Sequence, residues 1–398
     1  MHSTMMTELS RNALERADVL VAQVTAQVIS GESELADRTV VPVADVADTV
    51  SHLMRNFYLH FAEGAAPDVE AVRAVGHRRA QQGVPLPAVL HGFRIGFRLA
   101  WKYLVEQVAL DDVEAMHALV QHTDRIWLLL DDYSGEPRDA YRERAADLVR
   151  FAEAERHRYL DTLLSPGPDE IGRKLVSAEA LGLARNGRYL VLAAQGGSPA
   201  DQTAWEAAFN AHGALVLWRS APEGTVGVVA AGPPPADWAE LPDRLGVREP
   251  VRLGFSDAFT SVEAAARALH QARLALGSIP CGGSGMRRYA KDPVGCLAAA
   301  SPDDALDVAR ITLRDLVGLP SHQRDMFLDT LAAWLDAGGS IEGAAKALYC
   351  HRNTVRYRLR RIEELTGLHL GDPRDVAQLY LAIRATEQQG RSMLGKPR

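Results

Sequence analysis

The sequence has only three cysteines, Cys281, Cys296 and Cys350, and no two of them form a CxxC pair. A disulfide framework and a zinc knot are therefore both excluded. No apolar run approaches the roughly 20 residues that a membrane-spanning helix needs. The first residues also lack the basic stretch and apolar stretch of an export signal. These absences predict a soluble, cytoplasmic protein with no membrane partner.

Charge is unevenly distributed along the 398 residues. The whole chain has a net charge of −7, but residues 321–398 contain 12 Lys or Arg against 9 Asp or Glu. A basic end on an acidic protein indicates a polyanionic partner at that end. The hydrophobic fraction of 47% is typical of folded protein. The length is enough for several domains, each with its own core.

Residues 1–165 have the apolar spacing of helices almost throughout, which predicts a helical first domain. Further helices are expected at 116–130 and 141–164. The helix at 141–164 carries charges of both signs, which fits a solvated connecting helix or a dimeric coiled coil, and we favour the connector. The two clearest amphipathic stripes are Val46, Val50, Leu53, Met54 and Phe57, and Val89, Phe93, Phe97 and Trp101.

Residues 170–292 change to short apolar runs of strand length, which predicts a central α/β sandwich. Helices are expected between the strands, at 205–211 and 261–276, with Ser261 as an N-cap. Residues 220–224 are typical of a hairpin loop, and residues 232–235 of a second loop. The expected strands are 189–194, 214–218, 225–230, 251–255 and 286–289.

Residues 301–388 are helical again and are expected to form a third domain, followed by a frayed polar tail at 389–398. Within this domain, Gly338 and Gly339 end one helix and Ser340 caps the next. A small-residue face, a short turn and an apolar stripe on the following helix complete the pattern of a helix-turn-helix. The face and the stripe are Ala344, Ala345 and Leu348, then Val355, Leu359, Ile362 and Leu365.

The outer face of this last helix is strongly basic. Five arginines and no acid lie between His351 and Arg361. An arginine-rich solvated face is the ordinary explanation, but the cap, the turn and the stripe together favour insertion into a DNA major groove. Residues of the first turn can reach base edges, and later arginines can hold phosphates. The predicted DNA contacts are Ser340, His351, Arg352, Asn353, Thr354, Arg356, Tyr357, Arg358, Arg360 and Arg361.

Residues 351–362 resemble the C-terminal helix-turn-helix signature of the PucR/CdaR-type bacterial transcriptional regulators. In that family this helix is taken to read DNA, so the resemblance implies the same role here. Residues 365–367 and the expected helix at 375–386 continue the likeness to the end of the domain. Tyr349 departs from the general helix-turn-helix pattern, because it stands where the turn often has a glycine.

The resemblance extends to the other two domains. Residues 253–256 and 271–276 are similar to the middle domain of these regulators, a diverged relative of the diguanylate cyclase fold. An active cyclase needs a Gly-Gly-Asp/Glu-Glu-Phe turn and paired carboxylates for two metals, whereas residues 220–224 contain one acid. The middle domain is therefore expected to be GGDEF-like and without catalysis. Residues 79–86 and 91–101 resemble the helical, globin-like N-terminal domain of RsbR-type proteins, which is not expected to hold haem.

Several other side chains have both a functional and an ordinary interpretation. Three histidines suggest a metal or haem, but no second ligand has a recognisable spacing. Three arginines suggest an anionic effector, but arginines on helices more often pair with acids. Cys281 lies in a glycine-rich loop without an activating neighbour. We expect no metal and no cofactor; the histidines are His60, His77 and His91, and the arginines Arg78, Arg79 and Arg94.

The sequence thus predicts a mainly helical, multi-domain transcriptional regulator that binds specific DNA sequences and is not an enzyme. Its expected partners are double-stranded DNA, further copies of itself as a homodimer or higher oligomer, and a small-molecule effector or protein at the N-terminal domain. One alternative is a partner-switching signalling scaffold that does not bind DNA. The other is a nucleotide-processing enzyme that works in the middle domain.

Overall fold

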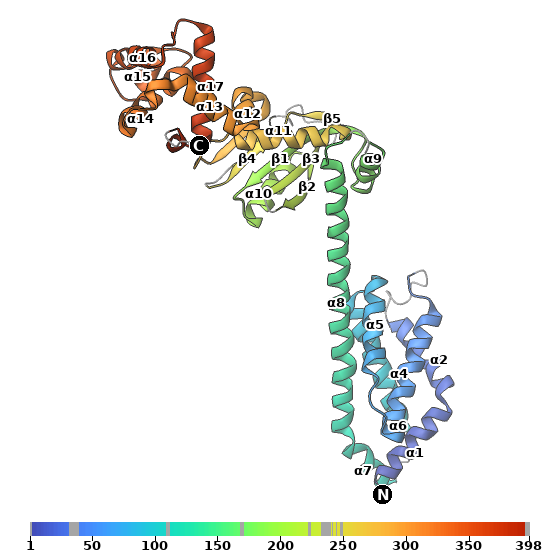
Figure 1. The fold of residues 1–398 in the computed structure, drawn as a ribbon. Helices are drawn as coiled ribbons and strands as arrows, with labels where there is room; N and C mark the ends of the chain where they lie inside the picture. Colours follow the sequence, from blue (N-terminus) through green and yellow to red (C-terminus); the bar gives the residue numbers. More distant parts are fainter. Residues whose placement is uncertain are drawn as a thin grey trace. The chain divides into compact units, whose positions relative to one another are not determined.

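The structure is a computed structural model that describes residues 2–31, 40–108, 112–167, 171–221, 224–231, 240, 242–243, 245–246 and 250–394. The chain divides into two compact units, Met1–Glu155 and Arg156–Arg398. Figure 1 shows the helices and strands within each unit. Among the described residues, none of the helices combines the length and the apolar character needed to cross a membrane.

The first unit is a bundle of helices around one apolar core. The two amphipathic stripes predicted from the sequence lie on α4 and α6 and contribute to this core. Tyr58 is fully buried there and donates its hydroxyl hydrogen to the carbonyl of Ala100 at 3.1 Å. The helices are α1 (His2–Glu15), α2 (Ala17–Gly31), α4 (Val43–Glu63), α5 (Val69–Gln81), α6 (Leu86–Glu106), α7 (Val113–Gln121) and α8 (Thr123–Leu164), which continues into the second unit.

The predicted separate helices at 116–130 and 141–164 are wrong, because α8 runs without a break from Thr123 through Pro137 to Leu164. Tyr133 is buried and donates its hydroxyl hydrogen to Oδ1 of Asn56 in α4 at 2.5 Å. Pro137 packs so closely on α5 that a Cβ at Gly76 would lie 2.2 Å from its carbonyl oxygen. Packing on α4 and α5 therefore offsets the hydrogen bond that a proline removes from a helix.

The second unit contains a mixed six-stranded sheet with strand order β2-β3-β1-β4-β6, in which β5 also pairs with β1. Strand β1 is antiparallel to β3, β4 and β5, whereas β4 and β6 are parallel. Each of the five predicted strands forms. Strand β5 was not predicted, because its three residues are too few to show a period. The strands are β1 (Asn186–Gln195), β2 (Ala214–Ala221), β3 (Gly224–Ala231), β4 (Arg252–Phe255), β5 (Phe259–Ser261) and β6 (Gly285–Arg288).

The hairpin predicted at 220–224 is confirmed by the antiparallel pairing of β2 with β3, which reaches Ala221 opposite Gly224. The loop predicted at 232–235 lies outside the described residues. Ser261 does cap a helical turn, since its side chain accepts a hydrogen bond from the backbone N–H of Glu263. The helices of this part are α9 (Ile171–Ala180), α10 (Pro199–Asn210), η3 (Val262–Ala264), α11 (Ala265–Gly277), η4 (Tyr289–Lys291) and α12 (Pro293–Ala300).

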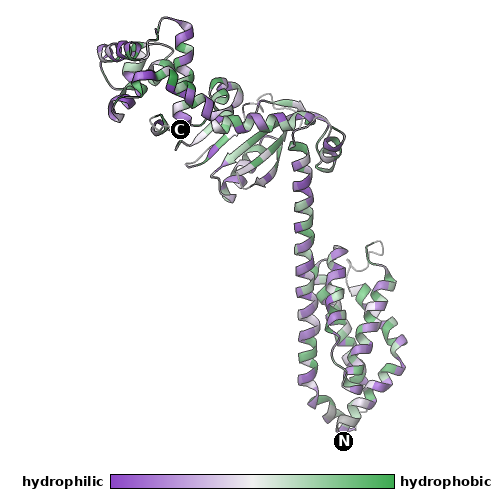
Figure 2. Cartoon of the chain, viewed as in Figure 1, coloured by the Kyte–Doolittle hydropathy of each residue, from purple (hydrophilic) through white to green (hydrophobic). Residues whose placement is uncertain are grey.

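Both faces of the sheet are covered, as expected for an α/β sandwich. Alternate residues of β1 enter two separate cores, so that Val191 packs with residues of α11 while Leu192 packs with Trp205 and Phe209 of α10. In Figure 2 the hydrophobic residues gather on the strands, whereas α8 is largely hydrophilic. Helix α11 lies so close to β4 that a Cβ at Gly254 would be 2.2 Å from a carbonyl oxygen of that helix.

The C-terminal helices surround a core of their own. The tail predicted to be frayed from residue 389 is instead packed on the domain up to Leu394, whose side chain is buried. Arg391 pairs with Asp329 at 2.7 Å, and the carbonyl of Met393 accepts a hydrogen bond from Arg310 at 2.8 Å. The helices are α13 (Pro302–Leu313), η5 (Arg314–Leu316), α14 (Ser321–Asp336), α15 (Ile341–Ala347), α16 (Arg352–Thr366), α17 (Pro373–Gln389) and η6 (Arg391–Met393).

A polar seam between α12 and α17 joins the C-terminal helices to the sheet. Arg384 of α17 pairs with the buried carboxylate of Asp292 at 2.7 Å, and Asp292 also accepts the backbone N–H of Gly295 at the start of α12. Gln388 donates to the carbonyl of Gly295 at 2.8 Å. These contacts explain why the sheet and the C-terminal helices form one compact unit.

Candidate nucleic-acid interface

The helix-turn-helix predicted from the sequence is formed by α15 and α16 (Figure 1). Gly338 and Gly339 follow α14 with φ of 60° and 84°, in the left-handed region where glycine is favoured. The hydroxyl oxygen of Ser340 accepts the backbone N–H of Gly343 at 3.1 Å and so caps α15. Ser340 thus has a structural role in addition to its predicted contact with DNA.

The turn between the two helices is made by Tyr349, which has φ of 49°. Its side chain is 98% exposed, so the ring contributes nothing to the core. The neighbouring turn is held by a hydrogen bond from the backbone N–H of Cys350 to the carbonyl of Ala345 at 3.0 Å. The turn therefore adopts the left-handed geometry usual for glycine, at the steric cost that a Cβ imposes there.

Replacing Tyr349 with glycine is expected to raise the free energy of unfolding by about 0.5–1 kcal/mol. A left-handed conformation costs a residue with a Cβ about 1–2 kcal/mol, and the extra freedom of an unfolded glycine takes back roughly 0.5–1 kcal/mol. Tyr349→Ala keeps the backbone strain and should change stability by less than about 0.5 kcal/mol. Urea unfolding of the native protein and the two variants measures these changes in stability. If Tyr349→Gly and Tyr349→Ala were equally stable, the backbone at Tyr349 would not be strained.

Helix α16 begins at a histidine cap. The Nδ1 atom of His351 accepts the backbone N–H of Asn353 at 3.2 Å. Buried Val355, Leu359 and Ile362 then hold α16 against α14 and α15, and Leu365 is partly buried against the same core. The predicted stripe therefore faces inward, which leaves the opposite face of α16 to solvent.

Six of the predicted contact residues are exposed on α16. The exposed side of the helix centres on Asn353, Tyr357 and Arg360, and Tyr357 is 68% exposed. Arg361 pairs with Glu364 at 2.6 Å, and Arg352 lies 3.8 Å from Glu342 of α15. Both pairs are on the surface and leave these guanidinium groups accessible. The six residues are Arg352, Asn353, Arg356, Tyr357, Arg360 and Arg361.

Arg358 does not share this outer face, contrary to the expectation of five outward arginines. It is half-buried on the side of α16 next to α14, where Nη1 donates to Oγ1 of Thr330 at 3.4 Å. Thr354 is half-buried as well. The reason is the helical period, because both positions lie between the buried stripe and the exposed face.

Two further exposed residues stand next to this face and were not predicted. Lys346 lies on the exposed side of α15, and the ring of Tyr349 lies in the turn before α16. The first helix of a helix-turn-helix crosses the DNA backbone, so its outward lysine is well placed for a phosphate. The sequence held a signal for Lys346, since it falls on the side of α15 away from buried Ala344 and Ala345.

The histidines considered for a metal or haem have ordinary environments. His60 donates from Nδ1 to the carbonyl of Ala65 at 2.7 Å, and His77 lies 3.9 Å from Glu143 on the surface. His91 is exposed. No group of three or more metal-ligating side chains occurs among the residues that the structure describes. Cys281 is also exposed, as a free thiol.

The arginines considered for an anionic effector are largely engaged by a carboxylate. Arg78 and Arg79 both pair with Asp45 at 2.5 Å, and Gln82 donates to the same group. Burial works against ionisation of Asp45, but the hydrogen bonds from Gln82, Arg78 and Arg79 outweigh it and lower the pKa of this carboxyl. Arg94 is exposed.

Comparison with known proteins finds a matching family model for each of the three parts of the chain. The family model described as the PucR C-terminal helix-turn-helix domain matches residues 327–385. The model of the RsbT co-antagonist protein rsbRD N-terminal domain matches residues 18–156. A GGDEF-like domain model matches residues 168–277. The three resemblances seen in the sequence are therefore confirmed.

Similar curated proteins come from several bacteria. An uncharacterized protein of Mycobacterium tuberculosis is 51% identical over 55 residues, which is 14% of this chain and 13% of that protein. The carbohydrate diacid regulator of Escherichia coli is 48% identical over 60 residues, 15% of this chain and 16% of the regulator. The purine catabolism regulatory protein of Bacillus subtilis is 38% identical over 96 residues, 24% of this chain and 18% of that protein. The chain thus spans less than a fifth of each relative's length.

Proposed function

We propose that this PucR/CdaR-type protein is a cytoplasmic transcriptional regulator that binds double-stranded DNA through α16. The observation that carries the proposal is the outer face of this helix, where Arg352, Asn353, Arg356 and Arg360 are exposed together above a buried apolar stripe. The major groove, about 12 Å wide, admits a helix with its side chains. The regulators of carbohydrate diacid use and purine catabolism among the relatives support this assignment.

Within this proposal the two ends of α16 have different roles. Arg352 and Asn353 lie in the first turn, and their side chains can form paired hydrogen bonds with guanine and adenine edges. Arg356, Arg360 and Arg361 lie further along and bind phosphates. Lys346 and Tyr349 add contacts from the preceding helix and turn. Glu364 marks the end of the contact surface, because its carboxylate would repel the DNA backbone.

A homodimer fits this mode of binding. One recognition helix reads only a few base pairs, so specificity commonly needs two half-sites about 34–36 Å apart. The helical first unit receives the signal, as a small-molecule effector or a protein. The middle domain has no catalytic role in this proposal, and purified protein with GTP and magnesium should give no nucleotide product.

Single substitutions test the groove model. Asn353→Ala and Arg352→Ala should each cost about 1–3 kcal/mol on the preferred operator and relax base choice at one position. Arg360→Ala should weaken binding uniformly across sequences and reduce the slope of log K against log salt by about 1. Fluorescence anisotropy with operator and scrambled duplexes at several salt concentrations measures both effects.

Arg185→Ala is the matched control, because Arg185 is an exposed arginine of the middle domain that pairs with Glu263. It should leave operator affinity and the salt slope unchanged. If the three α16 variants bind as tightly as the native protein, α16 does not enter the groove. If the native protein protects no DNA but still binds a protein partner, the protein is a signalling scaffold and not a DNA-binding regulator.

A further inference from the structure

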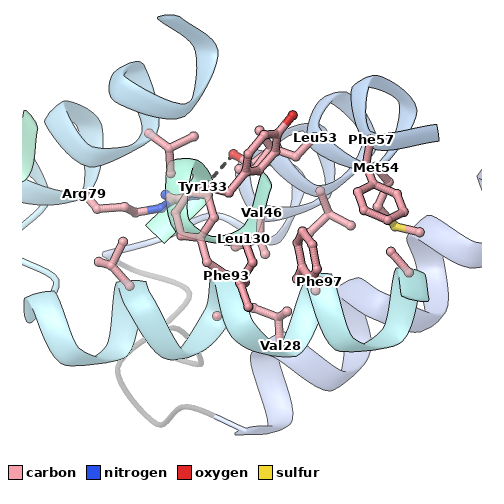
Figure 3. Close-up of a pocket in the computed structure, with 17 residues that line it drawn as sticks. Val28, Val46, Leu53, Met54, Phe57, Arg79, Phe93, Phe97, Leu130 and Tyr133 are labelled. Carbon is pink, nitrogen blue, oxygen red and sulfur yellow. Dashed lines mark hydrogen bonds between the residues drawn. The ribbon is translucent and has the colours of Figure 1, made fainter. Parts of the chain in front are cut away.

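A cavity of about 90 Å³ lies inside the helical first unit and is partly open to solvent. Helices α2, α4, α5, α6 and α8 each contribute to its wall (Figure 3). Folded interiors are normally packed as densely as organic crystals and have few voids larger than a water molecule. An unfilled space of this size within the core of a small helical bundle therefore requires an explanation.

The wall of the cavity is almost wholly apolar. Phe57 and Phe97 meet edge to face with their ring centroids 5.2 Å apart, and Phe93 lies on the same side of α6. Phe93 and Phe97 pack against the main core but remain only half-buried, because the cavity is next to them. Apolar cavities bind apolar molecules, and an enclosed one of about 150 Å³ takes benzene; this cavity is smaller but is partly open to solvent.

Two glycines on α6 line the space. Gly92 and Gly96 are one turn apart in the helix interior and both line the cavity. Glycine is unfavourable within a helix, so its presence there usually has a structural reason, such as the close approach of a neighbouring helix. At Gly96 close packing is not the reason for a glycine, because an added Cβ would meet only Cγ1 of Val24, at an ordinary van der Waals distance of 3.8 Å. The missing side chain therefore preserves the cavity at some cost to helix stability.

The polar groups on the wall are already engaged by the protein. Arg79 is 4% exposed and pairs with Asp45, and Gln82 accepts a hydrogen bond from the same guanidinium at 2.6 Å. Thr49 donates its hydroxyl hydrogen to the carbonyl of Asp45 at 2.8 Å, and Tyr133 donates to Asn56. The guanidinium of Arg79 thus already has partners within the protein before any ligand enters, although Asp45 is shared with Arg78. An anionic ligand would have to compete with Asp45, whereas a neutral ligand would not.

We propose that this cavity is a binding site for a small neutral molecule with a single aromatic or alicyclic ring. The apolar wall and the ring edges of Phe57, Phe93 and Phe97 recognise the ring, and ionised ligands are disfavoured because the apolar wall does not solvate a charge and Arg79 is already engaged by Asp45. The site concerns the helical unit alone and does not depend on whether α16 binds DNA.

Isothermal titration of the full-length protein with phenol, benzamide, benzoate and benzylamine tests this class of ligand. Benzamide and benzoate have the same shape and differ in charge, so their comparison isolates the effect of charge. Phenol and benzamide should bind with one site per chain, and benzoate and benzylamine at least about tenfold more weakly. Gly96→Leu places a side chain in the cavity and should weaken phenol binding at least about tenfold.

Arg98→Leu is the matched control, because it introduces the same side chain on the exposed side of α6. It should change phenol affinity by less than about twofold. Should Gly96→Leu not fold, Gly96→Ala has room for its Cβ and should still weaken phenol binding. Absence of binding by both neutral probes, or tighter binding of benzoate than of benzamide, would overturn the proposal. Operator titration without any probe reports separately on the DNA-binding function.

Discussion

Replacing Asp292 with alanine is expected to lower the free energy of unfolding of the second unit by about 3–5 kcal/mol. Asp292 is 6% exposed and receives a hydrogen bond from Arg384 at 2.7 Å. Burial opposes the charge on Arg384, but Asp292 and then Glu387 outweigh it and raise the pKa of this guanidinium. The substitution would leave a desolvated cation with only one carboxylate and would also remove the cap of α12.

Two control variants separate the contribution of the buried charge to stability from that of the helix cap and from that of an ordinary surface ion pair. Asp292→Asn keeps an acceptor for the backbone N–H of Gly295 but loses the charge, so it should cost less than Asp292→Ala. Glu364→Ala removes the exposed partner of Arg361 and should cost less than about 1 kcal/mol. Urea unfolding followed by circular dichroism gives all three values. If Asp292→Ala costs no more than Glu364→Ala, the ion pair does not hold the seam between α12 and α17.

Local signals in the sequence were enough to predict the helix-turn-helix and the main strands. Ser340, the two glycines before it and the stripe at Val355, Leu359 and Ile362 act within one or two helical turns. Such features depend little on the rest of the fold. The same holds for β1 and β3, whose apolar runs are buried on both faces of the sheet.

Features that depend on distant contacts were not predictable. The sequence around Pro137 indicates a break, and only packing on α4 and α5 makes α8 continuous there. The hydrogen bond from Arg358 to Thr330 likewise joins two helices, and a basic run alone does not report such a contact. The pairing of Arg79 with Asp45 joins residues 34 positions apart, and no periodic pattern reports such a contact.

Replacing Asp45 with asparagine is expected to destabilise the helical unit by about 3 kcal/mol or more. The variant keeps the shape of the side chain but leaves Arg79, which is 4% exposed, without its carboxylate. Asp18→Asn is the control, since Asp18 pairs with Arg55 on the surface with 93% of its side chain exposed, and it should cost less than about 1 kcal/mol. Urea unfolding at pH 7 compares the two variants with the native protein.

The difference in stability between the native protein and Asp45→Asn should depend on pH, because the pKa of Asp45 is lowered in the folded state. A carboxyl with a lowered pKa in the folded state stabilises the fold above its unfolded pKa of 3.8, and this stabilisation is lost as pH falls through the lower, folded value. The gap in stability between the native protein and Asp45→Asn should therefore narrow below about pH 4. A gap that stays constant down to pH 2 would show that the carboxylate charge is not its source.

The same substitution should reverse the charge preference of the cavity. In the native protein Asp45 pairs with Arg79, so benzoate would have to compete with this carboxylate and benzamide is preferred. In Asp45→Asn the guanidinium of Arg79, which lines the cavity, has no carboxylate partner, and benzoate can supply one with a charge-assisted hydrogen bond. Benzoate should then bind at least about tenfold more tightly than benzamide. An unchanged preference for benzamide would mean that the apolar wall, and not the pairing of Arg79, excludes the anion.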